Sequence, residues 1–259
     1  MHPLGWIVWS SGAAIATMTT TNPFYLAIVF ASAWIVHAAH HRTGPEARSF
    51  RIFLIVGVAT VATRSMLVLL GPVTAGSLTA GFLEGLRLAV LLGVFGAFNS
   101  VADPYGVLKL APRRFHEAAL AAALALSIAP RTIASAVRVR EAQRMRGIGV
   151  GTWRALPALA VPVLETGMEE AVVLAESMDA RGHGRGTRSR YRPVSWGWTG
   201  VLTALSSLVG AGLFLAALVT ADGSLVVSTF PLVWPVPSLP LIAGCLAFAL
   251  PAFLPRDDV

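Results

Sequence analysis

The chain has 259 residues, of which 55% are hydrophobic and only 13% are charged, and its mean hydropathy is +0.69. Soluble domains carry about 25% charged residues, so this composition excludes an ordinary soluble domain and indicates an integral membrane protein. A net charge of +7 suggests nucleic-acid binding in a soluble protein. In a membrane protein, arginines beside the spans mark the cytoplasmic side instead, and we expect no nucleic-acid partner. The single Cys245 rules out a disulfide within the chain.

Six apolar segments are candidates for membrane-spanning helices, which need about 20 mostly apolar residues. They cover residues 4–20, 23–39, 52–70, 82–101, 196–220 and 232–254. The first is expected to be retained, because the N-terminus lacks the basic region and cleavage site of a signal peptide. Pro23 is suited to start the second helix, where its missing N–H costs nothing. The Ala- and Leu-rich residues 117–129 are too few for a span and predict a helix at the membrane edge.

The loops predict the orientation. Lys and Arg gather in residues 40–51, 105–114 and 131–192 and in the C-terminal tail, whereas residues 20–22, 71–81 and 221–231 contain none. By the positive-inside rule, both termini and residues 131–192 lie in the cytoplasm. We therefore predict an all-α polytopic membrane protein with membrane helices in residues 1–112 and 193–259. Residues 113–192 form a cytoplasmic region between them.

This cytoplasmic region contains a short repeat. Its copies begin at Glu141 and Glu176, and in each the Glu precedes an Arg-Gly pair by five residues. Gly-x-Gly-Thr then follows at the same spacing in both copies. Each copy ends a predicted amphipathic helix, over residues 131–146 and from Pro157 or Pro162 to Arg181, and a glycine stops each helix.

The second of these helices has one apolar face, formed by residues that recur every three or four positions. The face consists of Val161, Leu164, Met168, Val172, Ala175 and Met178. Acidic residues, among them Glu165 and Glu169, give the helix a charged side.

Two interpretations of the Arg-Gly pairs are open. An arginine in the last turn is favourable beside the negative end of the helix dipole, and the glycine is then a plain C-cap. The whole pattern from the Glu to the Thr recurs about 35 residues later, which favours a role in docking on a partner protein. In that interpretation the glycine lets a partner surface approach closely, and the arginine fork binds its carboxylates or carbonyls. The predicted docking residues are Met145, Arg146, Gly147, Ala180, Arg181 and Gly182, with Glu141 and Glu176 in support.

The paired motif resembles that of the transmembrane T component of energy-coupling factor (ECF) transporters, the EcfT/CbiQ family. Ala180-Arg181-Gly182 matches the family's Ala-Arg-Gly motif, and Met145-Arg146-Gly147 matches it with Met in place of Ala. Asn22-Pro23, Asp103-Pro104 and Pro130 extend the resemblance over most of the chain.

The resemblance implies two long, crossed coupling helices whose ends, at Arg146 and Arg181, contact two ABC-type ATPases. It also implies a membrane-embedded S component that binds the substrate, a vitamin or a transition-metal ion. The apolar face from Val161 to Met178 would pack against the other coupling helix and this S component. The chain would lie in a bacterial or archaeal cell membrane. It would bind no cofactor, because the partner ATPases use the ATP and Mg²⁺.

Other function classes find less support. The chain lacks a P-loop, since its one lysine, Lys109, lies between two leucines. A self-contained secondary transporter or channel needs charged or broken-helix sites at mid-membrane, for which Arg64 is the single indication. Glu84 and Arg87 are expected to pair on one helix face. A membrane enzyme would need an acid/base pair at a membrane face, and no such pair stands out in the sequence.

The histidines near the end of the second span suggest solvated interfacial side chains more than a metal site; they are His37, His40 and His41.

Overall fold

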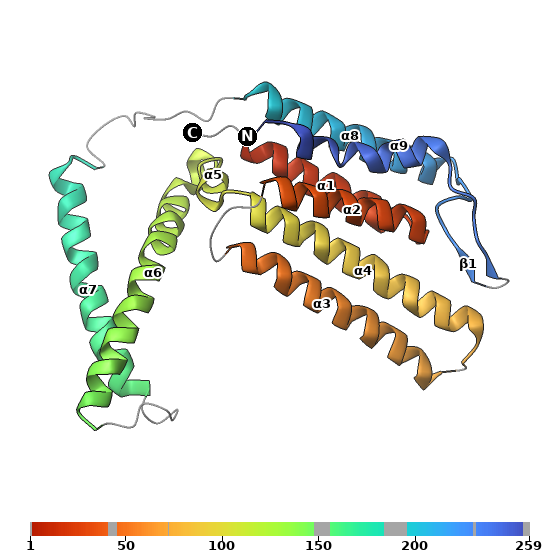
Figure 1. Cartoon of the computed structure of the whole chain (residues 1–259). Coiled ribbons are helices and arrows are strands. Elements are labelled where there is room, and N and C mark those ends of the chain that lie inside the picture. Colours follow the sequence, from red (N-terminus) through yellow and green to blue (C-terminus); the bar gives the residue numbers. More distant parts are fainter. Residues whose placement is uncertain are drawn as a thin grey trace. The chain divides into compact units, whose positions relative to one another are not determined.

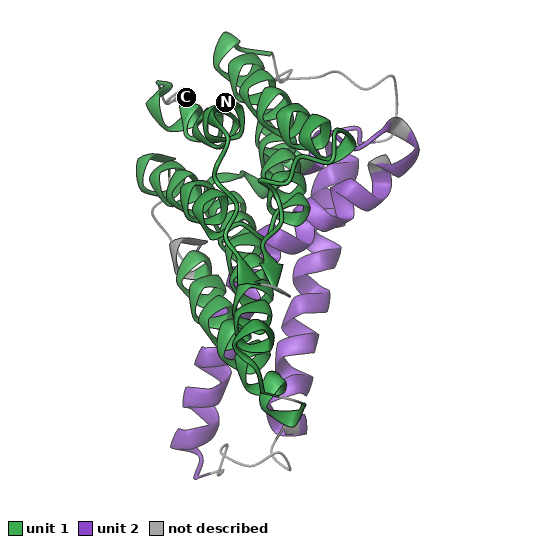
Figure 2. Ribbon diagram, turned by 90° about the vertical axis from the view of Figure 1, so that its right-hand side faces the viewer, with its two compact units in different colours: residues 1–107, 194–259 green, residues 108–193 purple. Residues whose placement is uncertain are grey.

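The computed structural model describes residues 2–40, 46–71, 73–147, 156–183, 196–229 and 232–255. These residues are mostly helical and group into two compact units (Figures 1 and 2). Unit 1 comprises Met1–Val107 and Val194–Val259, and unit 2 comprises Leu108–Pro193. The assignment of residues 113–192 to a cytoplasmic region stays a prediction.

Unit 1 is a bundle of helices with one small hairpin. Its first helices are α1 (Pro3–Thr19), α2 (Pro23–His40), α3 (Glu46–Leu67) with the 3₁₀ turn η1 (Val68–Leu70), α4 (Ala75–Val101) and α5 (Pro104–Leu108), which reaches the unit boundary. After unit 2 follow α8 (Trp198–Val219), β1 (Ser228–Thr229), β2 (Leu232–Val233), α9 (Leu239–Ala247) and the 3₁₀ turn η4 (Leu250–Phe253). The two strands pair antiparallel, with Thr229 opposite Leu232.

Five helical segments are long and apolar enough to cross a membrane, which confirms an all-α polytopic membrane protein. They are Pro23–His40, Ser49–Leu70, Ala75–Val101, Glu117–Met145 and Trp198–Val219. Four of the five correspond to predicted spans. The first predicted span is helix α1, which has 17 residues and is not among the five.

The sixth predicted span is not one helix. Residues 232–254 contain strand β2, an extended segment, the nine-residue α9 and the turn η4. Prolines explain this division. Pro240 lies in the first turn of α9, where a proline is tolerated, whereas Pro251 follows α9 and cannot supply the N–H that would continue it.

Helix α4 begins seven residues before the predicted start at Phe82. A reciprocal capping box at Thr74 and Ser77 fixes this start, since the Ser77 N–H donates to Thr74 Oγ1 at 3.1 Å. The Thr74 N–H donates in return to Ser77 Oγ at 2.9 Å. Such a box satisfies two amide donors that the first turn leaves without helical partners.

Close packing of α3 on α4 depends on a glycine. A Cβ atom added to Gly85 would lie 2.8 Å from the Cα of Val61 in α3. Small residues at helix contacts are common in membrane bundles, because lipid provides no hydrophobic force that would drive helices together. Elsewhere in unit 1, α1 contacts α8, and α9 contacts α8 and α2. The large side chains Trp9, Tyr25, Phe214 and Phe248 fill the centre and are fully buried.

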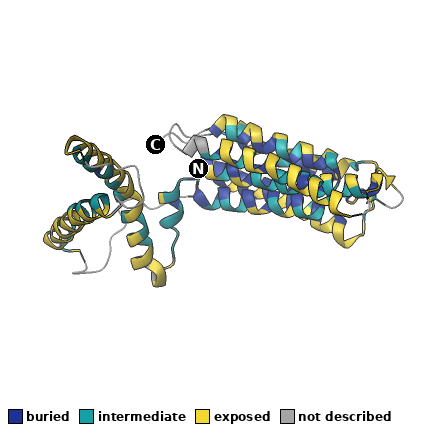
Figure 3. Cartoon of the chain, turned by 90° about the horizontal axis from the view of Figure 1, so that it is seen from below, coloured by how far each residue is buried: buried dark blue, intermediate teal, exposed yellow. Residues whose placement is uncertain are grey.

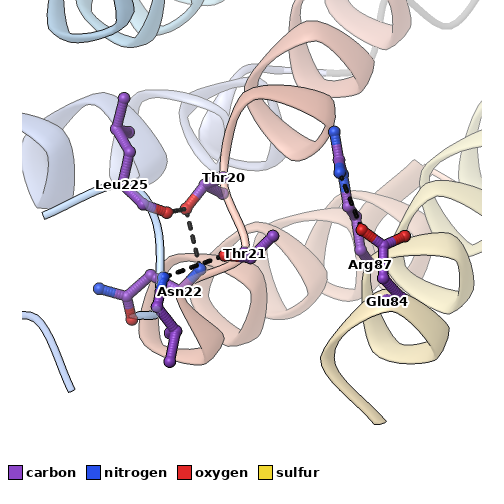
Figure 4. Close-up of polar contacts among 7 residues, drawn as sticks. Thr20, Thr21, Asn22, Glu84, Arg87 and Leu225 are labelled. Atoms are coloured by element: carbon purple, nitrogen blue, oxygen red, sulfur yellow. Dashed lines mark hydrogen bonds and ion pairs between the residues drawn. The ribbon is translucent and has the colours of Figure 1, made fainter. Parts of the chain in front are cut away.

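The turn between α1 and α2 is tied to the chain segment that follows α8 (Figure 4). Asn22 is fully buried, and its Nδ2 donates to the carbonyl of Ser224 at 2.9 Å. The Thr20 hydroxyl and the Thr21 N–H both donate to the carbonyl of Leu225, at 2.7 and 3.0 Å. Burial of these polar groups is tolerated because each is hydrogen-bonded. The turn therefore does more than start α2, because it also holds the α1–α2 connection against the segment that follows α8.

Candidate functional site

Two long helices form most of unit 2. After the short 3₁₀ turn η2 (Arg113–Phe115), α6 runs over His116–Met145 and α7 over Leu156–Ala180. They contact each other near the end of α6 and the start of α7, where Gln143 Nε2 donates to the Ala158 carbonyl at 3.4 Å. The two helices cross near this contact in Figure 1 and diverge away from it.

Helix α6 is continuous, whereas the sequence suggested two helices separated at Pro130. Pro130 lies inside α6 and removes one backbone hydrogen bond of the helix. Ala129, Pro130 and Arg131 are exposed, so solvent can reach the backbone there. Alanine and leucine, which are strong helix formers, dominate the preceding turns. Helix α7 likewise contains Pro162 in its interior.

Both helices end in the same backbone geometry. Gly147 and Gly182 have φ angles of +76° and +77°, the left-handed conformation that glycine adopts most readily. Each glycine N–H donates to the carbonyl three residues before it, Gly147 to Arg144 at 3.0 Å and Gly182 to Asp179 at 2.8 Å. In α7 the His183 N–H also donates to the Met178 carbonyl at 3.0 Å, which completes a Schellman motif. The predicted glycine stops are thus confirmed.

The two helix ends are open surfaces. Met145 is 84% exposed, and the side chains of Arg146, Ala180 and Arg181 are exposed as well. A Cβ atom added to Gly147 or Gly182 would meet nothing within 4 Å among the described residues. The arginine follows the last helical residue in each case, beside the negative end of the helix dipole. The arrangement leaves each guanidinium available to a partner.

The supporting residues Glu141 and Glu176 are exposed but lie apart from the arginines. Five residues advance an α-helix by about 500°, so each Glu points in a different direction from its Arg. Among the described residues no ion pair joins them. Their role stays a prediction.

The apolar face of α7 is open. Val161, Leu164, Met168 and Val172 are 57–71% exposed, Ala175 is exposed and Met178 is half-buried. Exposed residues dominate both helices of unit 2 in Figure 3. Packing of this face against α6 and against a membrane-embedded partner, which the family resemblance implies, stays a prediction.

Charged residues inside the spans form one ion pair among the described residues. Arg87 Nη1 lies 3.4 Å from Glu84 Oε1, as predicted. Arg64 is exposed in the last turn of α3, where the helix dipole favours a cation. The Glu84–Arg87 pair lies near the middle of α4.

Two of the three histidines noted in the sequence lie among aromatic rings, contrary to the expected solvated side chains. The His37 ring stacks on Phe50 at 3.9 Å and lies 2.7 Å from the Ser100 hydroxyl. His40 is buried beside the edge of Trp6. Both rings pack against aromatic side chains of neighbouring helices, so His37 is half-buried and His40 is buried. His41 lies outside the described residues.

Sequence reasoning missed the anchoring role of Asn22. Its side chain holds the segment after α8, although more than 200 positions separate Asn22 from Ser224. The signal available was a run of three hydrogen-bonding residues, Thr20-Thr21-Asn22, between two apolar segments. Such a run in a membrane protein needs internal partners.

Comparison with known proteins finds a distant relative. Over 140 residues the chain is 29% identical to the energy-coupling factor transporter transmembrane protein EcfT of Bacillus selenitireducens. The match covers 48% of this chain and 52% of the relative, so the chain spans about half the length of the curated relative it matches. No family model matches the chain.

Proposed function

We propose that this chain is the transmembrane coupling (T) subunit of an ECF-type importer. It would transmit ATP-driven movement of two ABC-type ATPases to a membrane-embedded S component. The observation that carries the proposal is the pair of exposed Arg-Gly ends with matched backbone geometry on two contacting helices. The distant similarity to an EcfT protein supports it.

The helices are suited to relay movement. Helix α6 has 30 residues and α7 has 25, lengths of about 45 and 38 Å at 1.5 Å per residue. They contact each other near one point, where Gln143 reaches Ala158. ATP and Mg²⁺ would be bound by the ATPases, whose closure would shift the two arginine-bearing ends. A stiff helix pair converts such a shift into movement along its length.

The open face of α7 is the proposed contact for the S component. Val161, Leu164, Met168 and Val172 expose apolar surface that a partner would cover. The S component would bind the substrate, a vitamin or a transition-metal ion, in the cell membrane. This chain would then carry out no bond chemistry itself, and both of its termini would face the cytoplasm.

The test replaces both docking arginines. In the Arg146→Ala/Arg181→Ala variant, we expect recovery of the ATPases with the affinity-purified chain to fall at least about a hundredfold. Each hydrogen bond to a charged group contributes about 1.5–3 kcal/mol, and about 1.4 kcal/mol corresponds to a factor of ten. ATP-dependent uptake should be lost while membrane insertion is retained.

The matched control is Arg51→Ala/Arg114→Ala, which removes two exposed arginines that do not belong to either Arg-Gly pair. This control should retain ATPase recovery and uptake. Normal coupled uptake by the Arg146→Ala/Arg181→Ala variant would contradict the site assignment. Absence of ABC-type ATPases from the purified wild-type complex would contradict the proposed function.

A further inference from the structure

We infer that the membrane-embedded S component docks on the α3–α4 pair through a carboxylate of one of its membrane helices, which Arg64 and Arg87 bind. The inference rests on the proposed function and adds a contact within the membrane to the proposed contact on α7. Three charged residues would form the docking site: Arg64 of α3 and Glu84 and Arg87 of α4. We call them the α3–α4 charge cluster.

The α3–α4 charge cluster lies deep in two candidate spans. Glu84 and Arg87 are the tenth and thirteenth of the 27 residues of α4. Arg64 lies at the same level, because a Cβ added to Gly85 would lie 3.2 Å from the Cβ of Arg64. Ionisable side chains at such depth are costly, and they almost always face the interior of a bundle or a water-filled cavity.

These side chains instead face the surroundings of the chain. Those of Arg87 and Glu84 are 22% and 46% exposed, and Arg64 is exposed as well. In a membrane these surroundings are hydrocarbon or another protein. Hydrocarbon provides no hydrogen-bond partner. A protein that covers the α3–α4 charge cluster with polar groups would remove this cost.

The charges within the α3–α4 charge cluster do not balance. Arg87 Nη1 lies 3.4 Å from Glu84 Oε1, whereas a strong charge-assisted hydrogen bond measures about 2.7–2.9 Å (Figure 4). Arg87 Nε is buried and has no hydrogen-bond partner among the described residues. No ion pair joins Arg64 to Glu84 in the described part of the chain. Two guanidinium groups and one carboxylate leave a net charge of one, which an additional anion would neutralise.

A lipid phosphate does not meet this need at Arg87. The hydrocarbon core is about 30 Å thick, so the headgroups begin about 15 Å from its middle. Helix α4 is about 40 Å long at 1.5 Å per residue, and Arg87 lies near its midpoint. An arginine side chain is too short to reach a headgroup from there. The anion must therefore come from a protein at the depth of Arg87.

A second copy of this chain does not meet the need either. Two copies would bring together two clusters of the same net charge, and like charges at an interface are costly. A membrane helix with an Asp or Glu has the opposite charge, and a carboxylate matches the planar fork of a guanidinium. The S component is the membrane-embedded protein of the proposed assembly, so we assign this helix to it.

Photo-crosslinking of the complete complex in native membranes tests the docking surface. Phe82 and Phe95 of α4 are both exposed, at 49% and 40%. At about 100° per residue, Phe95 points within about 20° of the direction of Glu84, and Phe82 points about 160° away from it. A benzophenone analogue of phenylalanine replaces each in turn. We expect position 95 to capture the S component, identified as the membrane protein without a P-loop that co-purifies with the ATPases.

Position 82 is the matched control and should capture lipid. Lipid alone or a second copy of this chain at position 95 would overturn the inference, as would equal capture of the S component at both positions. Recovery of the ATPases with the same complex tests the proposed function separately. Their absence from the purified wild-type complex would contradict that function.

Neutral variants test the charges. Arg87→Gln should reduce recovery of the S component with the purified complex at least about tenfold, because the partner carboxylate loses a buried cation. Arg64→Gln should reduce recovery less, because Arg64 is more exposed. Glu84→Gln should retain recovery, because it removes the carboxylate that competes for Arg87. Arg51→Gln is the control at an exposed arginine of α3 outside the cluster. All four variants should retain the ATPases.

A purely structural ion pair predicts a different pattern. Removing either partner would then lower the thermal unfolding midpoint and the recovery of the S component equally, and equal losses for Arg87→Gln and Glu84→Gln would overturn the inference. Charge exchange provides the final check. Arg87→Glu should lose the S component, and an arginine in place of its crosslinked acidic residue should restore recovery. Failure of every such exchange, with the ATPases still bound, would also overturn the inference.

Discussion

At the scale of single residues, Gly147 and Gly182 have two separable properties. Their positive φ angles disfavour other residues, and their missing side chains leave room for a partner. Asparagine tolerates the left-handed conformation better than alanine does. Replacing the glycine with alanine or with asparagine therefore separates the need for the left-handed backbone conformation from the need for a surface without a side chain.

We predict that Gly182→Ala and Gly182→Asn both reduce ATPase recovery, because each adds a side chain to the docking surface. Alanine should also destabilise the end of α7, by about 1–2 kcal/mol for a left-handed residue. Gly167→Ala is the control, since a Cβ there also meets nothing within 4 Å and the site lies inside α7. Normal ATPase recovery with Gly182→Asn would show that the glycine serves only as a helix cap.

At the scale of elements, the α3–α4 pair depends on backbone proximity at Gly85. A Cβ added there would lie 2.8 Å from the Cα of Val61, and backbone atoms cannot move aside as a flexible side chain can. The two helices would have to separate. Overpacking of this kind commonly costs about 1–3 kcal/mol.

We therefore expect Gly85→Ala to lower the thermal unfolding midpoint of the protein in lipid nanodiscs. Gly212→Ala is the matched control in α8, because a Cβ there meets nothing within 4 Å among the described residues. That control should raise the midpoint or leave it unchanged, since alanine favours helices over glycine by about 1 kcal/mol. Equal midpoints for the two variants would contradict the packing explanation.

At the scale of the whole molecule, α6 decides the topology. Residues Glu117–Met145 are long and apolar enough to cross a membrane, although the charge distribution predicts a cytoplasmic helix. Single cysteines in a Cys245→Ala background distinguish the two arrangements. Suitable exposed positions lie on both sides of α6, at Lys109 and Met145, and in the segment after β2, at Val236.

We expect a membrane-impermeant maleimide to label Val236→Cys in intact cells. Lys109→Cys and Met145→Cys should both be labelled only after permeabilisation, because the proposed coupling helix lies on the cytoplasmic side. Wild-type protein and the Cys245→Ala background report any labelling of native groups. Labelling of Lys109→Cys and Met145→Cys from opposite sides would show that α6 crosses the membrane.

The amino-acid sequence by itself determined the class of protein and much of its helical structure. Composition identified a membrane protein, and apolar run length located α2, α3, α4 and α8. The glycines that end α6 and α7 could also be predicted from the sequence, because a left-handed helix cap depends only on residues within one turn. The Arg-Gly repeat could be recognised for the same local reason, and its docking role stays a proposal.

Only the tertiary structure decided the features that depend on distant contacts or on competition between local preferences. It showed that Asn22 anchors Ser224, that α6 continues through Pro130, and that residues 232–254 are divided. Residue periodicity carries no information on which distant carbonyl accepts a buried amide, whereas the folded chain must satisfy every such group.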